Sequence, residues 1–207
     1  MQVCMHRGAN QIGGSCAELK YKQHRLIIDL GLPLDAGSSQ LNNVPDTLNL
    51  MPAGEGRLSA IISHVHIDHY SLAHHFPAKK TVVYIGKSAQ RIIQASIPFT
   101  GQPDIKLQGK TFLADRQAFN IGDFQVTPFL VDHSAYDAYA LLIEAGGRRL
   151  FDSGDFRGHG RKAALFEKFI QSPPQPVHAL LMEGTSLGRA GFEQIVYSAE
   201  QPLNLAD

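Results

Sequence analysis

The stretch His64-Val65-His66-Ile67-Asp68-His69 decides how the rest of this chain is interpreted. It follows the short apolar run Ser59–Ser63, which is typical of a buried strand. In an extended segment that leaves a strand, residues two apart point to the same side. We therefore expect the first two histidines and Asp68 to face one way, and His69 to reach the same place from the start of the next element.

These side chains are suited to binding metal ions. Imidazole and carboxylate groups together favour zinc, and iron or manganese are further candidates. Under the alternative interpretation, the histidines are solvated or satisfied in the core, and four potential ligands within six residues are a coincidence. We therefore predict a metal site at the end of this strand.

One segment cannot surround two metal ions, so other segments must supply ligands. Asp132-His133-Ser134 follows the apolar run Phe124–Val131, and Asp152-Ser153-Gly154-Asp155 follows Arg148–Phe151. A histidine and an aspartate at the ends of two strands could converge on one rim. Taken alone, each would be an ordinary loop residue.

The remaining pattern alternates short strands with a few helices. It favours strands covered by helices, with a Pro- and Asn-rich loop between Gly31 and Gly56. The expected strands are Ser15–Tyr21, Arg25–Leu30, Ser59–Ser63, Thr81–Ile85, Ala118–Ile121, Asp123–Val131, Ala138–Glu144, Arg148–Phe151 and Val177–Met182, and the expected helices are Tyr70–His75, Ser88–Ile97 (ended by Pro98) and Lys162–Gln171.

Composition sets the broad class. At 207 residues the chain can form one domain with a substantial core, and its 19 Lys+Arg balance 19 Asp+Glu. The overall charge therefore does not indicate a nucleic-acid-binding protein, although a local cluster of basic residues remains an alternative. The two cysteines, Cys4 and Cys16, are expected to be reduced core residues. No signal peptide or membrane span is evident, so a cytoplasmic location is expected.

The histidine run resembles the HxHxDH signature of the metallo-β-lactamase superfamily. That resemblance implies an αββα four-layer sandwich of class α/β with two metal ions, most simply zinc, at its edge. It assigns His64, His66 and His133 to one ion and Asp68 and His69 to the other, with Asp155 bridging the two. Asp29, which ends the run RLIIDLG, matches the aspartate of the first motif.

Three further segments are similar to the β-CASP branch of that superfamily, which contains RNA-processing nucleases of the ribonuclease J kind. They are Gly8–Cys16, Asp132–Ala138 and Leu181–Thr185. For the first, the alternative is that Gly8, Gly13 and Gly14 only serve tight turns.

The chain departs from that pattern near its end. We expect a metallo-β-lactamase-like domain over residues 1–184 and a tail over 185–207 that could begin a truncated β-CASP domain, with the final strands of the sandwich lacking. The histidine that usually completes the second metal is missing from its place. Among the remaining histidines, His159 is the one that could approach the metals.

The resemblance implies a metal-dependent hydrolase, and we expect a phosphodiesterase acting on RNA. Asp68 would bind metal and orient the attacking hydroxide. Asp29 would act behind a ligand histidine, unless it only accepts backbone N–H bonds at a strand end. Glu183 would orient His133 or another ligand, unless it is an ordinary strand-end carboxylate.

Substrate contacts are expected from the basic loop 157–162 and from Tyr136, against the alternatives of a solvated loop and a packing role. The candidates are Arg157, His159, Arg161 and Tyr136. A hydrolase of a small thioester or acyl substrate on the same scaffold remains an alternative, as does an inactive domain. The sequence also leaves a homo-oligomer open.

Overall fold

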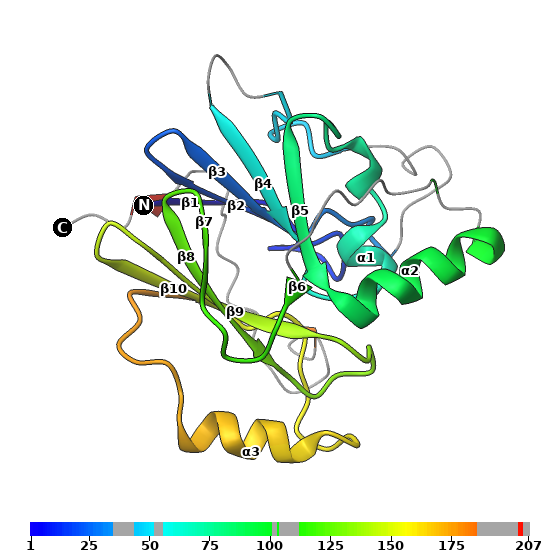
Figure 1. The fold of residues 1–207 in the computed structure, drawn as a ribbon, viewed down its shortest axis with the longest axis vertical. Coiled ribbons are helices and arrows are strands. Elements are labelled where there is room, and N and C mark those ends of the chain that lie inside the picture. Colours follow the sequence, from blue (N-terminus) through cyan, green and yellow to red (C-terminus); the bar gives the residue numbers. More distant parts are fainter. Residues whose placement is uncertain (35–43, 52–55, 101–102, 104–111, 186–202, 205–207) are drawn as a thin grey trace.

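The structure is a computed structural model that describes residues 1–34, 44–51, 56–100, 103, 112–185 and 203–204. In this part of the chain two β-sheets pack face to face, with helices on their outer faces (Figure 1). The first sheet has the strand order β12-β1-β2-β3-β4-β5-β6, and the second has the order β11-β10-β9-β8-β7.

The first sheet mixes antiparallel and parallel pairing. Strands β12 to β3 pair antiparallel, and β3 to β6 pair parallel. Its strands are β1 (Gln2–Arg7), β2 (Cys16–Tyr21), β3 (His24–Ile28), β4 (Arg57–Ile61), β5 (Thr81–Gly86), β6 (Phe112–Leu113) and β12 (Leu203–Asn204). Because β3 and β4 run parallel, the segments after Ile28 and Ile61 leave the sheet at the same edge.

The second sheet is antiparallel except at one edge, where β10 and β11 run parallel. Its strands are β7 (Phe119–Ile121), β8 (Phe124–Leu130), β9 (Tyr139–Ala145), β10 (Arg148–Asp152) and β11 (Ala179–Leu181). A turn with Gly146 and Gly147 at positive φ joins β9 to β10, a backbone conformation that two-residue hairpin turns require.

Three apolar clusters separate the layers. One lies between the sheets and joins residues such as Leu19 and Leu26 to Phe124 and Leu141. A second packs the first sheet against helix α1 (Ile67–Tyr70), the 3-10 helix η2 (Ala73–His75) and α2 (Lys87–Thr100). The third packs the second sheet against α3 (Ala163–Gln171), which lies below it in Figure 1. The expected αββα sandwich is thus confirmed.

Some boundaries differ from the sequence expectation. The first helix begins at Ile67, inside the histidine run, so Asp68 lies on a helix and not in an extended segment. Helix α2 continues through Pro98 to Thr100. Proline has no N–H to donate to the carbonyl of Gln94, but Gln94 is exposed and its carbonyl can bond to water instead. The expected strand Val177–Met182 is shorter in the structure, where β11 lies at a sheet edge with Leu180 54% exposed.

Other expectations concern segments of which the structure describes only a part. Within the loop 31–56, the described residues carry no strand or helix. Most of the tail 185–207 lies outside the described residues, and Leu203–Asn204 pairs with β1. Cys4 and Cys16 are both free thiols, with Cys16 buried. Among the described helices, none is long and apolar enough to cross a membrane.

A buried carboxylate anchors the outer side of β1 to β3. Glu18 is 2% exposed, accepts hydrogen bonds from His6 Nε2 at 2.7 Å and Arg25 Nε at 2.5 Å, and lies 3.6 Å from Lys20 Nζ. Burial by itself would raise the pKa of Glu18, but the hydrogen bonds from His6 and Arg25 lower it to about 2. The ionised form is therefore held in the folded state.

Replacing Glu18→Gln should destabilise the fold. A pKa lowered from 4.5 to about 2 corresponds to roughly 3 kcal/mol at pH 7. Because a lowered carboxyl pKa stabilises the fold above the unfolded value, the difference should shrink as the pH falls from about 4.5 toward 2. Urea unfolding of both proteins across this range measures it. Asp123→Asn, in a half-buried pair with His24, should change stability much less; equal losses would contradict the assignment.

Candidate metal centre

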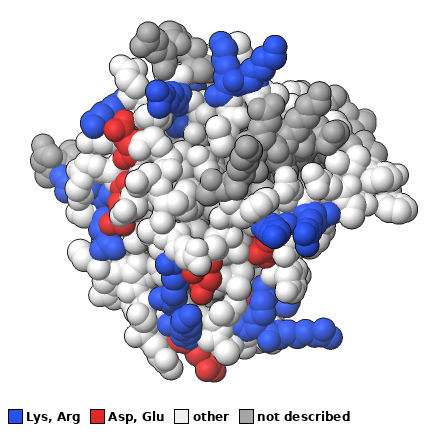
Figure 2. Space-filling view, viewed as in Figure 1, with Lys and Arg blue, Asp and Glu red and all other residues white. Residues whose placement is uncertain are grey.

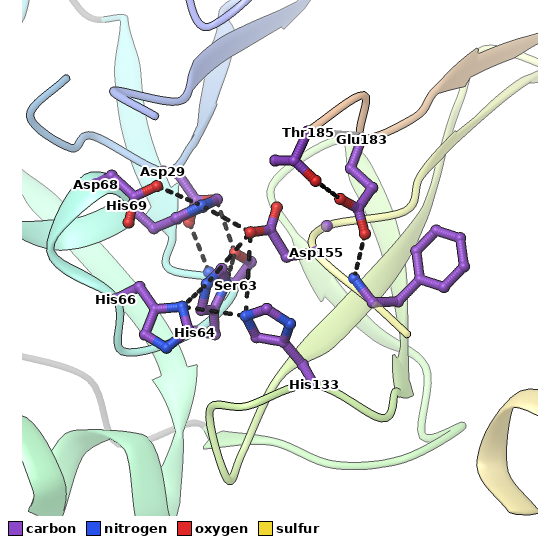
Figure 3. A network of polar contacts seen from close by, with 12 residues as sticks. Asp29, Ser63, His64, His66, Asp68, His69, His133, Asp155, Glu183 and Thr185 are labelled. Atoms are coloured by element: carbon purple, nitrogen blue, oxygen red, sulfur yellow. Dashed lines mark hydrogen bonds and ion pairs between the residues drawn. The ribbon is translucent and has the colours of Figure 1, made fainter. Parts of the chain in front are cut away.

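Side chains from both halves of the chain converge at one edge of the sandwich (Figure 3). Single ligand atoms of His64, His66, His133 and Asp155 all lie within 4.8 Å of one another. The two first histidines come from the segment after β4, His133 from the β8–β9 loop, and Asp155 from the loop after β10. The structure thus brings together residues up to 91 positions apart, which the sequence expectation placed at one rim.

Three histidine nitrogens form a compact triangle. His66 Nδ1 lies 3.1 Å from His64 Nε2 and 3.0 Å from His133 Nε2. The rings are steeply inclined to one another, at 70° to 84°, so their edges and not their faces meet. Ligands on a tetrahedral zinc ion, with bonds of about 2.0–2.1 Å, stand about 3.3 Å apart. The donor set and its spacing therefore fit a zinc-sized ion.

A second group lies beside this triangle. His69 Nε2 is 3.6 Å from Asp68 Oδ2 and 3.5 Å from Asp155 Oδ2. The same Asp155 oxygen is 3.9 Å from His64 Nε2 and 4.0 Å from His133 Nε2. Asp155 therefore occupies the position between the two groups that the resemblance gives to a bridging carboxylate.

Asp29 lies behind these ligands. It is 4% exposed and has φ of 60°, and its backbone N–H bonds to Ile61 O at 2.9 Å. Its Oδ2 accepts a hydrogen bond from His69 Nδ1 at 2.8 Å, and its two oxygens accept Ser63 N–H and Ser63 Oγ–H, each at 2.7 Å. Asp29 thus does both things considered for it: it accepts a backbone N–H and it orients a histidine.

The outer nitrogens of the histidines have hydrogen-bond partners of their own. Ser63 Oγ is 3.0 Å from His64 Nδ1, and Ser134 Oγ is 3.4 Å from His66 Nε2. With a proton on each of these outer nitrogens, the opposite nitrogens turn their lone pairs into the site. Sequence reasoning did not single out Ser63, and only its place directly before the histidine run could have indicated it.

Burial keeps the three-histidine triangle uncharged. It is the largest reason that the pKa of His64 and that of His66 are lowered, and it lowers the pKa of His133 to about 4. Neutral imidazole is the form that binds metal. Burial opposes the charged form of His69 as well, but Asp29 and Asp155 raise the pKa of His69 well above its usual value, and His69 in turn lowers that of Asp155.

Two buried carboxylates fix the loop that carries His133. Asp132 accepts a hydrogen bond from Gly160 N at 2.5 Å, and its Oδ1 lies 3.5 Å from Arg157 Nε. Asp137 accepts the N–H groups of Ser88 and Ala89, at 2.8 and 3.1 Å, at the start of α2. The motif from 132 to 138 therefore combines one candidate ligand with two residues that hold its loop in place.

Glu183 does not contact His133, contrary to one of the expectations. Its carboxylate accepts Phe156 N–H at 2.8 Å and Thr185 Oγ1–H at 2.6 Å (Figure 3). Its own N–H bonds to Ser153 Oγ at 2.9 Å. Glu183 thus fixes the backbone next to Asp155, because a strand-end carboxylate can reach the loop of the neighbouring strand.

The candidate substrate residues separate into two kinds. Arg157 Nε lies 3.5 Å from buried Asp132 Oδ1, and its backbone N–H bonds to Asp132 O, so its charge is paired with a carboxylate of the protein. His159 and Arg161 are exposed, and His159 lies outside the converging group found among the described residues. Tyr136 is 69% exposed, with Lys162 Nζ 5.8 Å from its ring centre and 2.7 Å from its carbonyl oxygen.

Glycines allow close approach around Asp68. Gly8, Gly13 and Gly14 all have positive φ, as tight turns require. A Cβ on Gly13 would also lie 3.1 Å from Asp68 Oδ2, and one on Gly31 would lie 1.8 Å from Asp68 O. The glycine-rich loop therefore does more than turn, because it covers the start of α1.

Solved structures with the same architecture identify the fold. A protein of unknown function from Enterococcus faecalis V583 matches with a TM-score of 0.72 and 23% identity, over 93% of this chain and 52% of that chain. Zn(2+)-bound PqqB from Methylobacterium extorquens matches with a TM-score of 0.57 and 15% identity, over 89% and 73%. The metallo-beta-lactamase fold protein YhfI from Bacillus subtilis matches with a TM-score of 0.52 and 18% identity, over 74% and 62%. The chain has the metallo-β-lactamase fold.

Sequence comparison adds distant relatives of this metallo-β-lactamase fold chain. No protein-family model matches it. Ribonuclease J of Mycoplasma genitalium and that of Mycoplasma pneumoniae are each 22% identical to it over 194 residues. The match covers 90% of this chain and 34% of each relative, so the chain spans about a third of the length of the curated relatives it matches.

Removal of a converging histidine should weaken the binding of one ion. We expect the chain to bind zinc. His64→Ala or His133→Ala should weaken the affinity for the ion at the three-histidine position more than about 100-fold, because loss of a residue that only hydrogen-bonds to a ligand already costs about 10–100-fold. Zinc titration against a chelator, with metal analysis, measures the affinity and the number of ions.

The matched control is His178→Ala, which removes an exposed imidazole at the start of β11. It should leave zinc affinity unchanged. A wild-type chain that takes up no zinc, or a His64→Ala variant with unchanged affinity, would contradict the metal centre.

Proposed function

We propose that this chain is a metal-dependent hydrolase that cleaves phosphodiester bonds in RNA. The observation that carries the proposal is the convergence of His64, His66 and His133 on one side of Asp155, with Asp68 and His69 on the other. The metallo-β-lactamase fold supports hydrolysis, and the ribonuclease J matches support RNA as the substrate.

The residues present fit two divalent ions, for which zinc is the first choice and manganese or iron the alternatives. The three histidines would hold one ion, and Asp68 and His69 the other, with Asp155 shared. When bound, such ions supply the Lewis acidity that makes water a nucleophile near neutral pH. Zn(2+)-bound PqqB is a solved example of this fold with zinc.

The side chains around this centre have distinct tasks in the proposal. Asp68, whose carboxylate is largely covered, would also accept a hydrogen bond from the attacking water and so orient it. Asp29 and Ser63 hold histidines in place and do not touch the substrate. Glu183 keeps the backbone after Asp155 in position.

A small rim beside His133 suits a nucleic-acid strand. Tyr136 offers an exposed aromatic face, on which a base can stack. Lys162 lies beside it, and Arg161, directly before Lys162 in the chain, is exposed. Elsewhere, Figure 2 shows basic side chains interleaved with acidic ones over the visible face, so contacts to phosphates would be local.

Hydrolysis of RNA tests the function directly. With zinc or manganese, the full chain should cleave single-stranded RNA, and His133→Ala should lower the rate at least about 100-fold, since a ligand is lost. His178→Ala should keep the wild-type rate. Turnover of a thioester or lactam with no cleavage of RNA or of a simple phosphodiester would overturn the proposal.

Binding of RNA should depend modestly on Arg161. Arg161→Ala is expected to weaken binding about equally for all sequences and to reduce the slope of log affinity against log salt by about 1. Fluorescence anisotropy at several salt concentrations measures both. Lys79→Ala, an exposed charge at the opposite edge of the sheet, is the control. Identical slopes for the wild type and Arg161→Ala would place the RNA elsewhere.

A further inference from the structure

The buried side chains of Asp29, Ser63 and His64 are connected by hydrogen bonds, and the donor of each bond can be identified. A carboxylate oxygen can only accept, so the 2.7 Å contact between Ser63 Oγ and Asp29 Oδ2 uses the single proton of the hydroxyl. Ser63 Oγ can then only accept at its 3.0 Å contact with His64 Nδ1. His64 therefore carries its proton on Nδ1, and its Nε2 presents a lone pair.

The same carboxylate orients a second ligand. His69 Nδ1 donates to Asp29 Oδ2 at 2.8 Å, which leaves His69 Nε2 facing Asp68 and Asp155. His64 belongs to the three-histidine triangle and His69 to the carboxylate-rich group. One buried carboxylate is thus connected to both groups, directly on one side and through a hydroxyl on the other.

From this geometry we propose that Ser63 is a positioning residue that extends the Asp29 carboxylate to His64, so that one carboxylate sets the ligand tautomers at both metal positions. The proposal rests on the metal centre proposed above, but not on its substrate.

Burial makes this relay specific to His64. His64 is 0% exposed and Ser63 is 2% exposed, so water cannot easily replace the hydroxyl. The corresponding contact of His66, to Ser134 Oγ at 3.4 Å, is longer, and Ser134 is exposed. Loss of Ser63 should therefore leave a buried imidazole free to hold its proton on the wrong nitrogen.

Zinc affinity of the full chain tests the relay. Ser63→Ala should weaken the ion at the three-histidine position about 10–100-fold and leave the other position nearly unchanged, whereas Asp29→Asn should weaken both. Ser63→Thr, which keeps the hydroxyl, should restore the affinity. Chelator competition with zinc, and the visible spectrum of the cobalt-substituted protein, report each position.

Ser71→Ala is the matched control, because it removes another buried serine hydroxyl, which accepts the N–H of Leu32 at 3.0 Å. It should destabilise the fold without changing zinc affinity. Equal effects of Ser63→Ala and Ser71→Ala on affinity, or unchanged affinity in Ser63→Ala, would overturn the proposal.

A measurement on the wild-type chain covers the case in which Ser63→Ala does not fold. Nitrogen-15 NMR of the histidine rings before metal is added should show His64 protonated on Nδ1, and protonation on Nε2 would overturn the relay. Chains that bind zinc as expected but do not cleave RNA would refute the proposed function and leave the relay standing.

Discussion

The structure depends on how the buried carboxylate of Asp29 is satisfied. A carboxylate that is 4% exposed is costly unless hydrogen bonds replace water. Its donors come from Ser63 and His69, while its own backbone N–H reaches Ile61. These contacts tie the end of β3 to the end of β4 and to α1. This one carboxylate therefore holds both the start and the end of the histidine run in place.

The sequence predicts the fold and the converging ligands better than it predicts their supports. Apolar alternation locates most of the strands but neither β1 nor β6, and the position of His133 and Asp155 after strands favours a place at the shared edge. The supporting contacts of Ser63 and of the pair Asp132–Arg157 are not predicted, because the sequence pattern around a serine or a loop arginine does not indicate which residue it contacts. The helix that begins at Ile67 also escapes, since its start depends on packing of Tyr70 and on the close approach of Gly31.

The motif around His133 illustrates how a candidate ligand and its supports can occupy one short segment. Asp132, His133 and Asp137 lie within six residues, and only the histidine faces the converging ligands. Both carboxylates point away and hold backbone N–H groups of other segments. Likewise, the basic side chain of Arg157, which follows Asp155 closely in the chain, is paired with the carboxylate of Asp132.

The division of the candidate ligands between the two halves would couple the proposed metal binding to folding. His64, His66, Asp68 and His69 follow β4 of the first sheet, whereas His133 and Asp155 follow strands of the second. An ion held by both sets adds its binding free energy to the packing of Leu19 and Leu26 against Phe124 and Leu141. Asp155 would contribute most to this coupling, because its carboxylate comes from the second half and lies close to histidines of both groups. The metal would thus act as a bond between the sheets at the edge where the apolar core ends.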